Sequence, residues 1–185
     1  MLQDQKGLFK PSAPLIFADG TEFYKKLGKE FIRHKKGYFV LAPSGVGKSH
    51  YVRNQAPGKK HWIDADRLWR FARAMPKGAW WEDQEIIPIV EQQCDIITLQ
   101  AKKQGFWMLG SANYWLRPDA IVLPHWTRHV KFIKIRELNY DGGAKSDDNS
   151  LAQVMDHRQW INKWVKEGVP KFSSVEDAVK HLSSL

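Results

Sequence analysis

The residues best suited to chemistry stand in one short stretch, which runs from Ala42 to His50 and reads APSGVGKSH. An apolar run precedes it and a polar segment follows, which predicts a strand, a loop with glycines and a helix that opens with Lys-Ser. Glycine permits backbone conformations in which successive N–H groups point at one anion, and the helix start adds a positive end. This is the form of a phosphate-binding loop, although the pattern asks for glycine at Ala42. The residues predicted to bind a nucleotide's phosphates are Ser44, Gly45, Val46, Gly47, Lys48, Ser49 and His50.

Within this loop, two side chains have distinct predicted roles. Lys48 is expected to reach the β- and γ-phosphates of ATP and to act in catalysis, because its charge can follow the phosphoryl group into the transition state. The Ser49 hydroxyl is expected to ligate Mg²⁺. The loop therefore predicts ATP and Mg²⁺ as cofactors.

Two carboxylates follow the next predicted strand, which covers residues 60–64. Because ligands bind at the carboxyl ends of strands in open α/β sheets, Asp64 and Asp66 are expected near the phosphate loop. Asp64, at the strand end, suits a Mg²⁺ ligand, and Asp66, in the first turn of the next helix, suits a general base. Two alternatives stay open: Asp66 is a plain helix N-cap, or one carboxylate fills both roles.

The predicted substrate-binding residues are Arg70, Trp80, Trp81 and Asn113, with Arg73 as a further basic residue. Two adjacent tryptophans cannot both point into one helical core face, so at least one is expected to be available for stacking on a base. The alternative is that both fill the gap between two helices. Asn113, after the third predicted strand, is placed to orient an acceptor.

The loop and the segment Ile63-Asp64-Ala65-Asp66-Arg67 resemble the small P-loop kinases of nucleosides, nucleotides and polynucleotide ends. The sequence of residues 43–49 resembles the phosphate loop of guanylate kinases, but the rest of the chain lacks the substrate-domain motifs of that family. The Asp66 segment is similar to the acceptor-base segment of phage polynucleotide kinases, in which an Asp is followed by an Arg. The resemblance covers residues 37–75, and it implies a five-stranded parallel core and phosphoryl transfer from ATP·Mg²⁺.

Kinases of this kind close a lid that brings arginines onto the transferring phosphate. The predicted lid is segment 140–167, a loop with glycines and three aspartates followed by an amphipathic helix. Arg158 in that helix is the predicted catalytic arginine, and Arg136 is a second candidate. The family leads one to expect a pair of arginines, but only Lys163 accompanies Arg158, and the alternative is a solvated surface arginine.

Alternating strands and helices predict an α/β fold of the P-loop NTPase three-layer type, with about five parallel strands and helices on both faces. The chain is expected to form one domain over residues 1–185, with an irregular arm at 1–20. Strands are predicted at 38–41, 60–64, 105–110, 120–123 and 130–135. Helices are predicted at 21–35, 50–55, 66–75, 82–103, 151–166 and 175–182.

Composition indicates an acidic partner in a reducing compartment. The 185 residues carry a formal charge of +9 and nine tryptophans, a combination that favours nucleic acids or nucleotides. The alternative is that tryptophan fills the core and the charge maintains solubility. A single cysteine, no signal-peptide pattern and no apolar run of ~20 residues predict a cytoplasmic protein without a membrane span, in the host cytoplasm if viral.

These expectations converge on transfer of the γ-phosphate of ATP to a hydroxyl of a nucleic acid or nucleotide. A hydroxymethylated base in viral DNA is one specific acceptor. An alternative is a kinase of a free nucleoside, a nucleoside monophosphate or another small metabolite, because the loop binds only the ATP donor and does not identify the acceptor. A nucleotide-gated nucleic-acid-binding module is another alternative, which needs no acceptor base.

Overall fold

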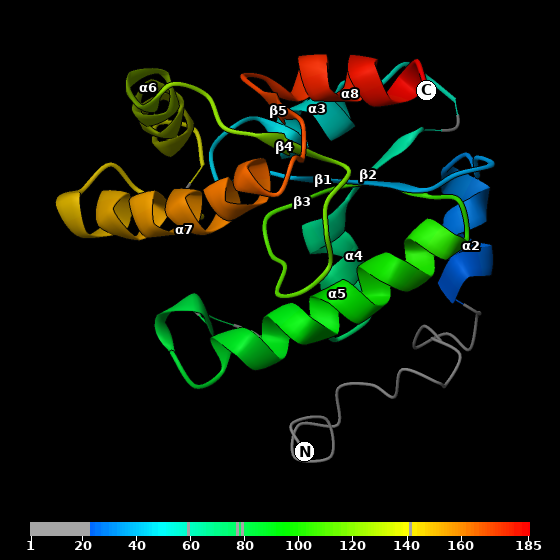
Figure 1. Ribbon diagram of the computed structural model, residues 1–185, viewed down its shortest axis with the longest axis horizontal. Helices are drawn as coiled ribbons and strands as arrows, with labels where there is room; N and C mark the ends of the chain where they lie inside the picture. Colours follow the sequence, from blue (N-terminus) through cyan, green and yellow to red (C-terminus); the bar gives the residue numbers. More distant parts are fainter. Residues whose placement is uncertain (1–22, 59, 77, 79, 141) are drawn as a thin grey trace. The chain divides into compact units, whose positions relative to one another are not determined.

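The computed structural model describes residues 23–58, 60–76, 78, 80–140 and 142–185. Within these ranges the chain forms one all-parallel sheet of five strands in the order β2-β3-β1-β4-β5, with seven α-helices and one 3-10 helix (Figure 1). The predicted α/β class and the parallel sheet are confirmed, and the arrangement is compatible with a three-layer α/β fold. The predicted arm at 1–20 and the first two residues of the predicted helix 21–35 lie outside the described residues.

The strands are short and mostly buried. They are β1 (Tyr38–Leu41), β2 (Trp62–Asp64), β3 (Trp107–Gly110), β4 (Ala120–Val122) and β5 (Lys171–Phe172). Every residue of β1 and β4 is buried, as expected of parallel strands whose sequences are continuous apolar runs. β4 pairs with β1 at Leu41↔Ile121 and with β5 at Ile121↔Lys171. The first four strands match predicted segments.

The predicted strand at 130–135 is wrong, because this segment belongs to helix α6 (Trp126–Glu137). Its alternation of apolar and basic residues imitates a strand, yet its buried residues, His129 and Ile133, are four positions apart, which is helical spacing. The fifth strand is instead β5, and two residues are too few to give a periodic signal.

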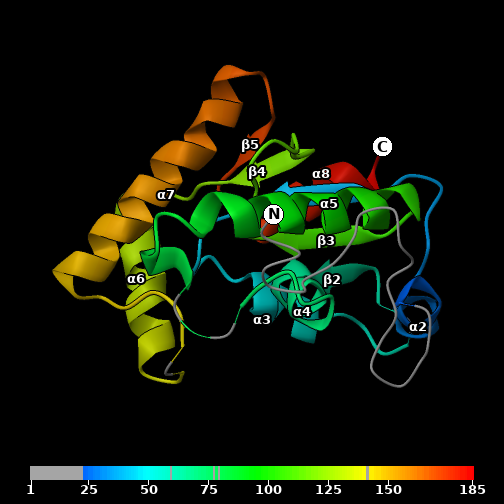
Figure 2. The same ribbon diagram turned by 90° about the horizontal axis from the view of Figure 1, so that it is seen from below.

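The contacts of the chain group into two compact units. The second unit, residues 39–54, 109–111 and 117–185, holds helix α3 (Lys48–Arg53), α6, α7 (Asp148–Lys166) and α8 (Val175–Ser183). In it, α8 packs on β4 and β5 and against α3, while α7 packs on β4. In the view of Figure 2, α7 passes across α6, and Arg158 of α7 contacts His129 of α6. Ser174 caps α8 by accepting the Asp177 N–H, and α7 begins three residues before its predicted start.

The first unit covers the described parts of 1–38, 55–108 and 112–116, and holds α2 (Phe23–Glu30), α4 (Ala65–Phe71), η1 (Trp80–Glu82) and α5 (Ile87–Lys103). Helix α5 starts later than predicted, with Pro88 in its first turn, where a missing N–H does no harm. In the core of this unit, the Trp69 indole donates to Thr98 Oγ1 at 3.0 Å, and the Thr98 hydroxyl donates to the Cys94 carbonyl at 2.7 Å. Helix α2 ends before its predicted end, and Phe31 forms an isolated bridge with Lys60.

Candidate functional site

The loop between β1 and α3 lies where the connections of the sheet diverge. β1 and β4 are neighbours, but the chain leaving β1 continues to β2 on one side, and the chain leaving β4 continues to β5 on the other. In open α/β sheets, ligands bind outside the carboxyl ends of strands at such a switch point. Topology thus gives loop 42–47 the position at which a ligand is expected.

Two glycines set the backbone of this loop. Gly45 has φ 87° and Gly47 has φ 98°, both in the left-handed region that glycine adopts without steric cost. At Gly45 the packing adds a second constraint, because a Cβ there would lie 2.7 Å from Ile133 Cγ1. The departure from the phosphate-loop pattern at Ala42 has a simple account: among the described non-glycine residues only Arg73 has a positive φ, so position 42 does not require glycine.

The Lys48 side chain folds back onto the loop that precedes it. Its side chain is only 7% exposed, and its Nζ donates to the Ala42 carbonyl at 2.9 Å and the Pro43 carbonyl at 2.8 Å. Backbone carbonyls thereby hold a mostly buried ammonium group at the loop. Ser49 and His50 are exposed in the first turn of α3, and the His50 ring lies 3.0 Å from Asn54 Nδ2.

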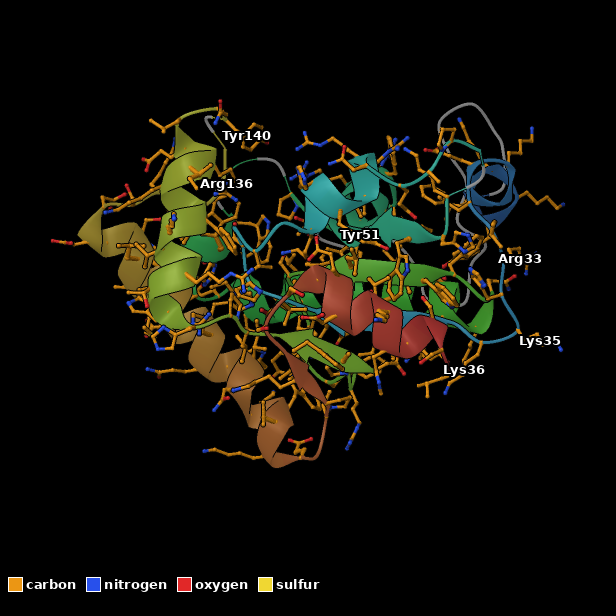
Figure 3. All side chains as sticks on the ribbon, turned by 90° about the horizontal axis from the view of Figure 1, so that it is seen from above. Arg33, Lys35, Lys36, Tyr51, Arg136 and Tyr140 are labelled. Carbon is orange, nitrogen blue, oxygen red and sulfur yellow. The ribbon has the colours of Figure 1, made fainter. Side chains whose placement is uncertain are left out.

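Two side chains from α6 bind the same loop, and Arg158 from α7 is linked to it through one of them. Arg136, at the C-terminal end of α6 (Figure 3), donates to Ser44 Oγ at 3.1 Å and to the Ala144 carbonyl at 2.6 Å. His129 Nε2 lies 2.7 Å from the Ser44 carbonyl, and His129 Nδ1 lies 3.0 Å from Arg158 Nη1. Ser44 is therefore held at both its carbonyl and its hydroxyl.

The predicted lid is anchored to α6 in this structure. Besides the bond from Arg136 to Ala144, the Ser146 N–H and hydroxyl both donate to the Glu137 carboxylate. Asp147 caps α7 by accepting the Ser150 N–H. Arg158 also donates to the Pro124 carbonyl at 2.8 Å, so this arginine is ordered rather than purely solvated.

Burial and positive charge act together on the histidines of this unit. Burial, and then the charges of Arg158, Lys48 and Arg136, lower the pKa of His129 to about 4, although its bond to Ser44 opposes the shift. Burial is also the main cause that lowers the pKa of His157 to about 4, followed by the charge of Lys48. At neutral pH both rings are uncharged, and Lys48, Arg136 and Arg158 carry the positive charge. The loop is surrounded by cations, which favours an anionic ligand.

The predicted acidic residues belong to the first unit. Asp64 is the N-cap of α4, and its Oδ1 accepts the Asp66 N–H at 3.1 Å. The alternative that Asp66 is the cap is therefore wrong, because its own N–H is the group that is capped. Asp66 stands half-buried in the first turn of α4.

The predicted substrate residues also belong to the first unit, and they differ in exposure. Arg70 is exposed, Trp80 is half-buried and Trp81 is 48% exposed, with the two indoles edge to face at 6.0 Å. Asn113 is buried, and its Nδ2 donates to the Leu116 carbonyl at 2.8 Å. The structure thus gives Asn113 a role in shaping its turn, and its side chain is not presented to solvent.

The sequence did not indicate two groups that the structure makes prominent. His129 was not identified because it directly precedes the segment 130–135, which was predicted to be a strand, so its helical spacing from Ile133 was not considered. In the first unit, the fully buried Asp95 accepts the N–H groups of three consecutive residues through Oδ2, at 2.9, 2.6 and 2.9 Å. These residues are Tyr114, Trp115 and Leu116.

Wider searches add no assignment. No protein-family model, curated protein or solved structure matches the chain. Over the described ranges, no group of three or more His, Cys, Asp or Glu residues could hold a metal ion. No helix among these residues has the length and apolar character needed to cross a bilayer.

Proposed function

We propose that this chain is an ATP-dependent kinase with a P-loop NTPase fold, which transfers the γ-phosphate to a hydroxyl of a nucleic acid or nucleotide. One observation carries the proposal: Lys48 and Arg136 bind the same left-handed glycine loop, and Arg158 joins them through His129. Three cations around one short loop match the several negative charges of a nucleoside triphosphate.

The loop's own construction supports phosphate as the anion. Its two left-handed glycines turn the backbone without side chains that would block close approach, and such backbone is typical of phosphate cradles. Lys48 already lies over this backbone on two carbonyls, so a bound phosphate would offer its ammonium group a stronger, charged acceptor.

The residues present also fit Mg²⁺. Mg²⁺ keeps several waters and is held by substrate phosphates with one or two protein ligands, so a preformed carboxylate cluster is not needed. Ser49, exposed in the first turn of α3, is the residue of the loop region that would hold it, and the role of Asp64 as a second ligand stays a prediction. When bound, ATP·Mg²⁺ supplies the phosphoryl group and neutralises part of its charge.

The remaining roles go to this chain's own side chains. Lys48, Arg136 and Arg158 stabilise negative charge around the transferring group. Asp66 accepts the proton of the attacking hydroxyl, a task that its half-buried position in the first turn of α4 permits. Arg70 and the exposed face of Trp81 bind the acceptor, through phosphate contact and base stacking respectively.

The experiment that tests this function offers ATP labelled at the γ-phosphate with separate pools of acceptors. The pools are nucleosides, nucleoside monophosphates, oligonucleotides and DNA that carries hydroxymethylated bases. Label is expected in a nucleotide or nucleic-acid pool and absent with Lys48→Ala protein. Label in the nucleoside pool alone would favour the small-molecule kinase. ATP binding without transfer to any pool would favour the binding module and overturn the proposal.

A further inference from the structure

The hydrogen bonds of His129 determine which of its nitrogens carries the proton. The ring is fully buried, with Nε2 2.7 Å from the Ser44 carbonyl oxygen and Nδ1 3.0 Å from Arg158 Nη1. A carbonyl oxygen can only accept a hydrogen bond, and a guanidinium group can only donate one. Both bonds form together only if the imidazole is neutral, with its proton on Nε2 and a lone pair on Nδ1.

From this geometry we infer that His129 is a positioning residue, which in its neutral Nε2–H form ties the backbone of the phosphate loop to Arg158. The inference rests on the proposed function, because it assigns how one of the proposed catalytic cations is aimed. His129 itself touches no substrate; it acts through Ser44 on one side and Arg158 on the other.

The surroundings of Arg158 make this link specific. Its second amino group donates to the Pro124 carbonyl at 2.8 Å, and its guanidinium lies 5.6 Å from the centre of the Trp126 ring. The Trp126 ring in turn packs edge to face against His129 at 6.0 Å. With the ring plane of His129 fixed in this way, movement of the Ser44 peptide is transmitted to the arginine. Arg136 holds Ser44 by its hydroxyl and is a separate attachment.

Protonation of His129 at Nδ1 would break its bond to Arg158 and keep its bond to the Ser44 carbonyl. The charged groups that act on His129 are Arg158 from α7, Lys48 from α3 and Arg136 from its own helix, and His157 from α7 is a further titratable neighbour. All three charges are positive. A proton on Nδ1 would oppose the Arg158 donor, whereas the bond from Nε2 to Ser44 would remain. The coupling is therefore a property of the neutral ring.

Nitrogen NMR of histidine-labelled wild-type protein tests the tautomer without reference to activity. We expect a His129 signal with protonated Nε2 and unprotonated Nδ1 that persists from pH 7.5 to 5.5, assigned by its absence in His129→Gln. A ring that carries its proton on Nδ1, or that becomes doubly protonated within this range, would overturn the inference. The tautomer is read from the unmodified chain, and His129→Gln serves only to assign the signal.

Three variants separate the two bonds. Asn places its amide near the position of Nδ1 and Gln near that of Nε2, while Phe keeps the ring and offers neither bond. We expect His129→Phe to lower the turnover number about 10- to 100-fold, since misplaced catalytic groups cost rates of that order. His129→Asn should recover part of the loss by accepting from Arg158. His129→Gln should mainly retain the affinity for ATP by holding Ser44.

A double-mutant cycle completes the test. If His129 works through Arg158, adding Arg158→Met to His129→Phe should lower turnover little further than Arg158→Met alone. Additive losses, or equal losses in ATP affinity and turnover for all three His129 variants, would show a merely structural role and overturn the inference. Failure of the proposed function would look different, because wild-type protein would then transfer no label to any pool.

Discussion

The loop after β1 and the segment from Asp64 to Trp81 carry the two halves of the proposed reaction, and they are built differently. In the loop region, two polar side chains are buried and bound to fixed backbone groups: Lys48 to two carbonyls and His129 to the Ser44 carbonyl. In the other segment, the side chains proposed to bind the acceptor are exposed, Trp81 by 48%.

The difference corresponds to two physical problems. A donor site that always receives the same triphosphate gains from cations fixed in advance, because they need no reorganisation as charge develops. An acceptor site that stacks bases gains from exposed rings, since every base has a π-face and stacking tolerates different sequences. The comparison predicts that substitutions in the first region lower the rate steeply and that those in the second lower binding moderately.

The largest effect is expected at Lys48. Lys48→Ala removes the buried ammonium group from the loop and should lower turnover by about 10³-fold or more, the order found when a preorganised electrostatic contact is lost. Single-turnover transfer from labelled ATP measures this loss. Lys180→Ala, which removes an exposed lysine on α8, is the matched control and should have wild-type turnover. Near-normal transfer by Lys48→Ala protein would refute the phosphate-loop assignment.

The next largest effect is expected for Asp64 and Asp66, which have different roles in the structure: Asp64 caps α4, and Asp66 does not. Asp66→Asn should lower turnover about 10²-fold or more with little change in ATP affinity, because it removes a general base and leaves the cap in place. Asp64→Asn should keep the cap but raise the Mg²⁺ concentration required. Asp64→Ala should also lower the free energy of unfolding by about 1 kcal/mol through loss of the cap.

Turnover and urea unfolding, measured on the same three proteins, check these expectations. If Asp66→Asn left turnover intact, the general base would lie elsewhere and the two regions would not divide the reaction as proposed.

The sequence predicted the local framework well, because short-range chemistry determines it. Apolar runs predicted β1 and β4, and the Lys-Ser pair marked the start of α3. Each of these features depends on residues that are close in the chain. The left-handed conformations of Gly45 and Gly47 belong to the same class.

What the sequence could not predict depends on contacts between distant residues. The segment 130–135 has an alternating pattern that fits a strand, and only its packing, with His129 and Ile133 buried together, makes it helical. The bonds from His129 and Arg136 to Ser44 join residues about 90 positions apart, which no local pattern encodes. Asp64, by contrast, was assigned to a metal from its place at a strand end, and its capping role appeared only with the geometry.

A smaller effect, on stability, is expected from the two histidines of the loop region whose pKa values are lowered. The pKa of His129 falls from 6.5 to about 4 in the folded chain, so the unfolded chain binds more protons between these values. The contribution of His129 to the free energy of unfolding is fully present above pH 6.5. It is lost as pH falls toward 4, by at most about 3 kcal/mol. His157, with a similar shift, should add to the loss.

Urea unfolding at pH 7.5, 6.0 and 5.0 measures this dependence. His129→Gln should flatten the loss of stability on acidification, and addition of His157→Gln should flatten it further. A wild-type protein with equal stability across this range would contradict the burial of neutral histidines and, with it, the contrast between a fixed and an exposed region.

The smallest effect is expected in the exposed region, for which the chain offers a matched pair of tryptophans. Trp81 and Trp115 are 48% and 45% exposed, but only Trp81 lies in the segment proposed to bind the acceptor. Trp81→Ala should weaken oligonucleotide binding by about 1–3 kcal/mol if one base stacks there. Trp115→Ala should have a smaller effect, and neither should change ATP affinity.

Salt dependence separates stacking from charge within the same experiment. The logarithm of the oligonucleotide binding constant should fall linearly with the logarithm of salt concentration, by about 0.7 for each phosphate neutralised on a single strand. Trp81→Ala should lower affinity without changing this slope, because an indole neutralises no phosphate. Arg70→Ala should reduce the slope by about 0.7 if the arginine contacts one phosphate. A flat salt response in the wild type, or equal losses for the two tryptophan variants, would assign the acceptor to small molecules and leave the loop region as the only part of the site that binds an anion.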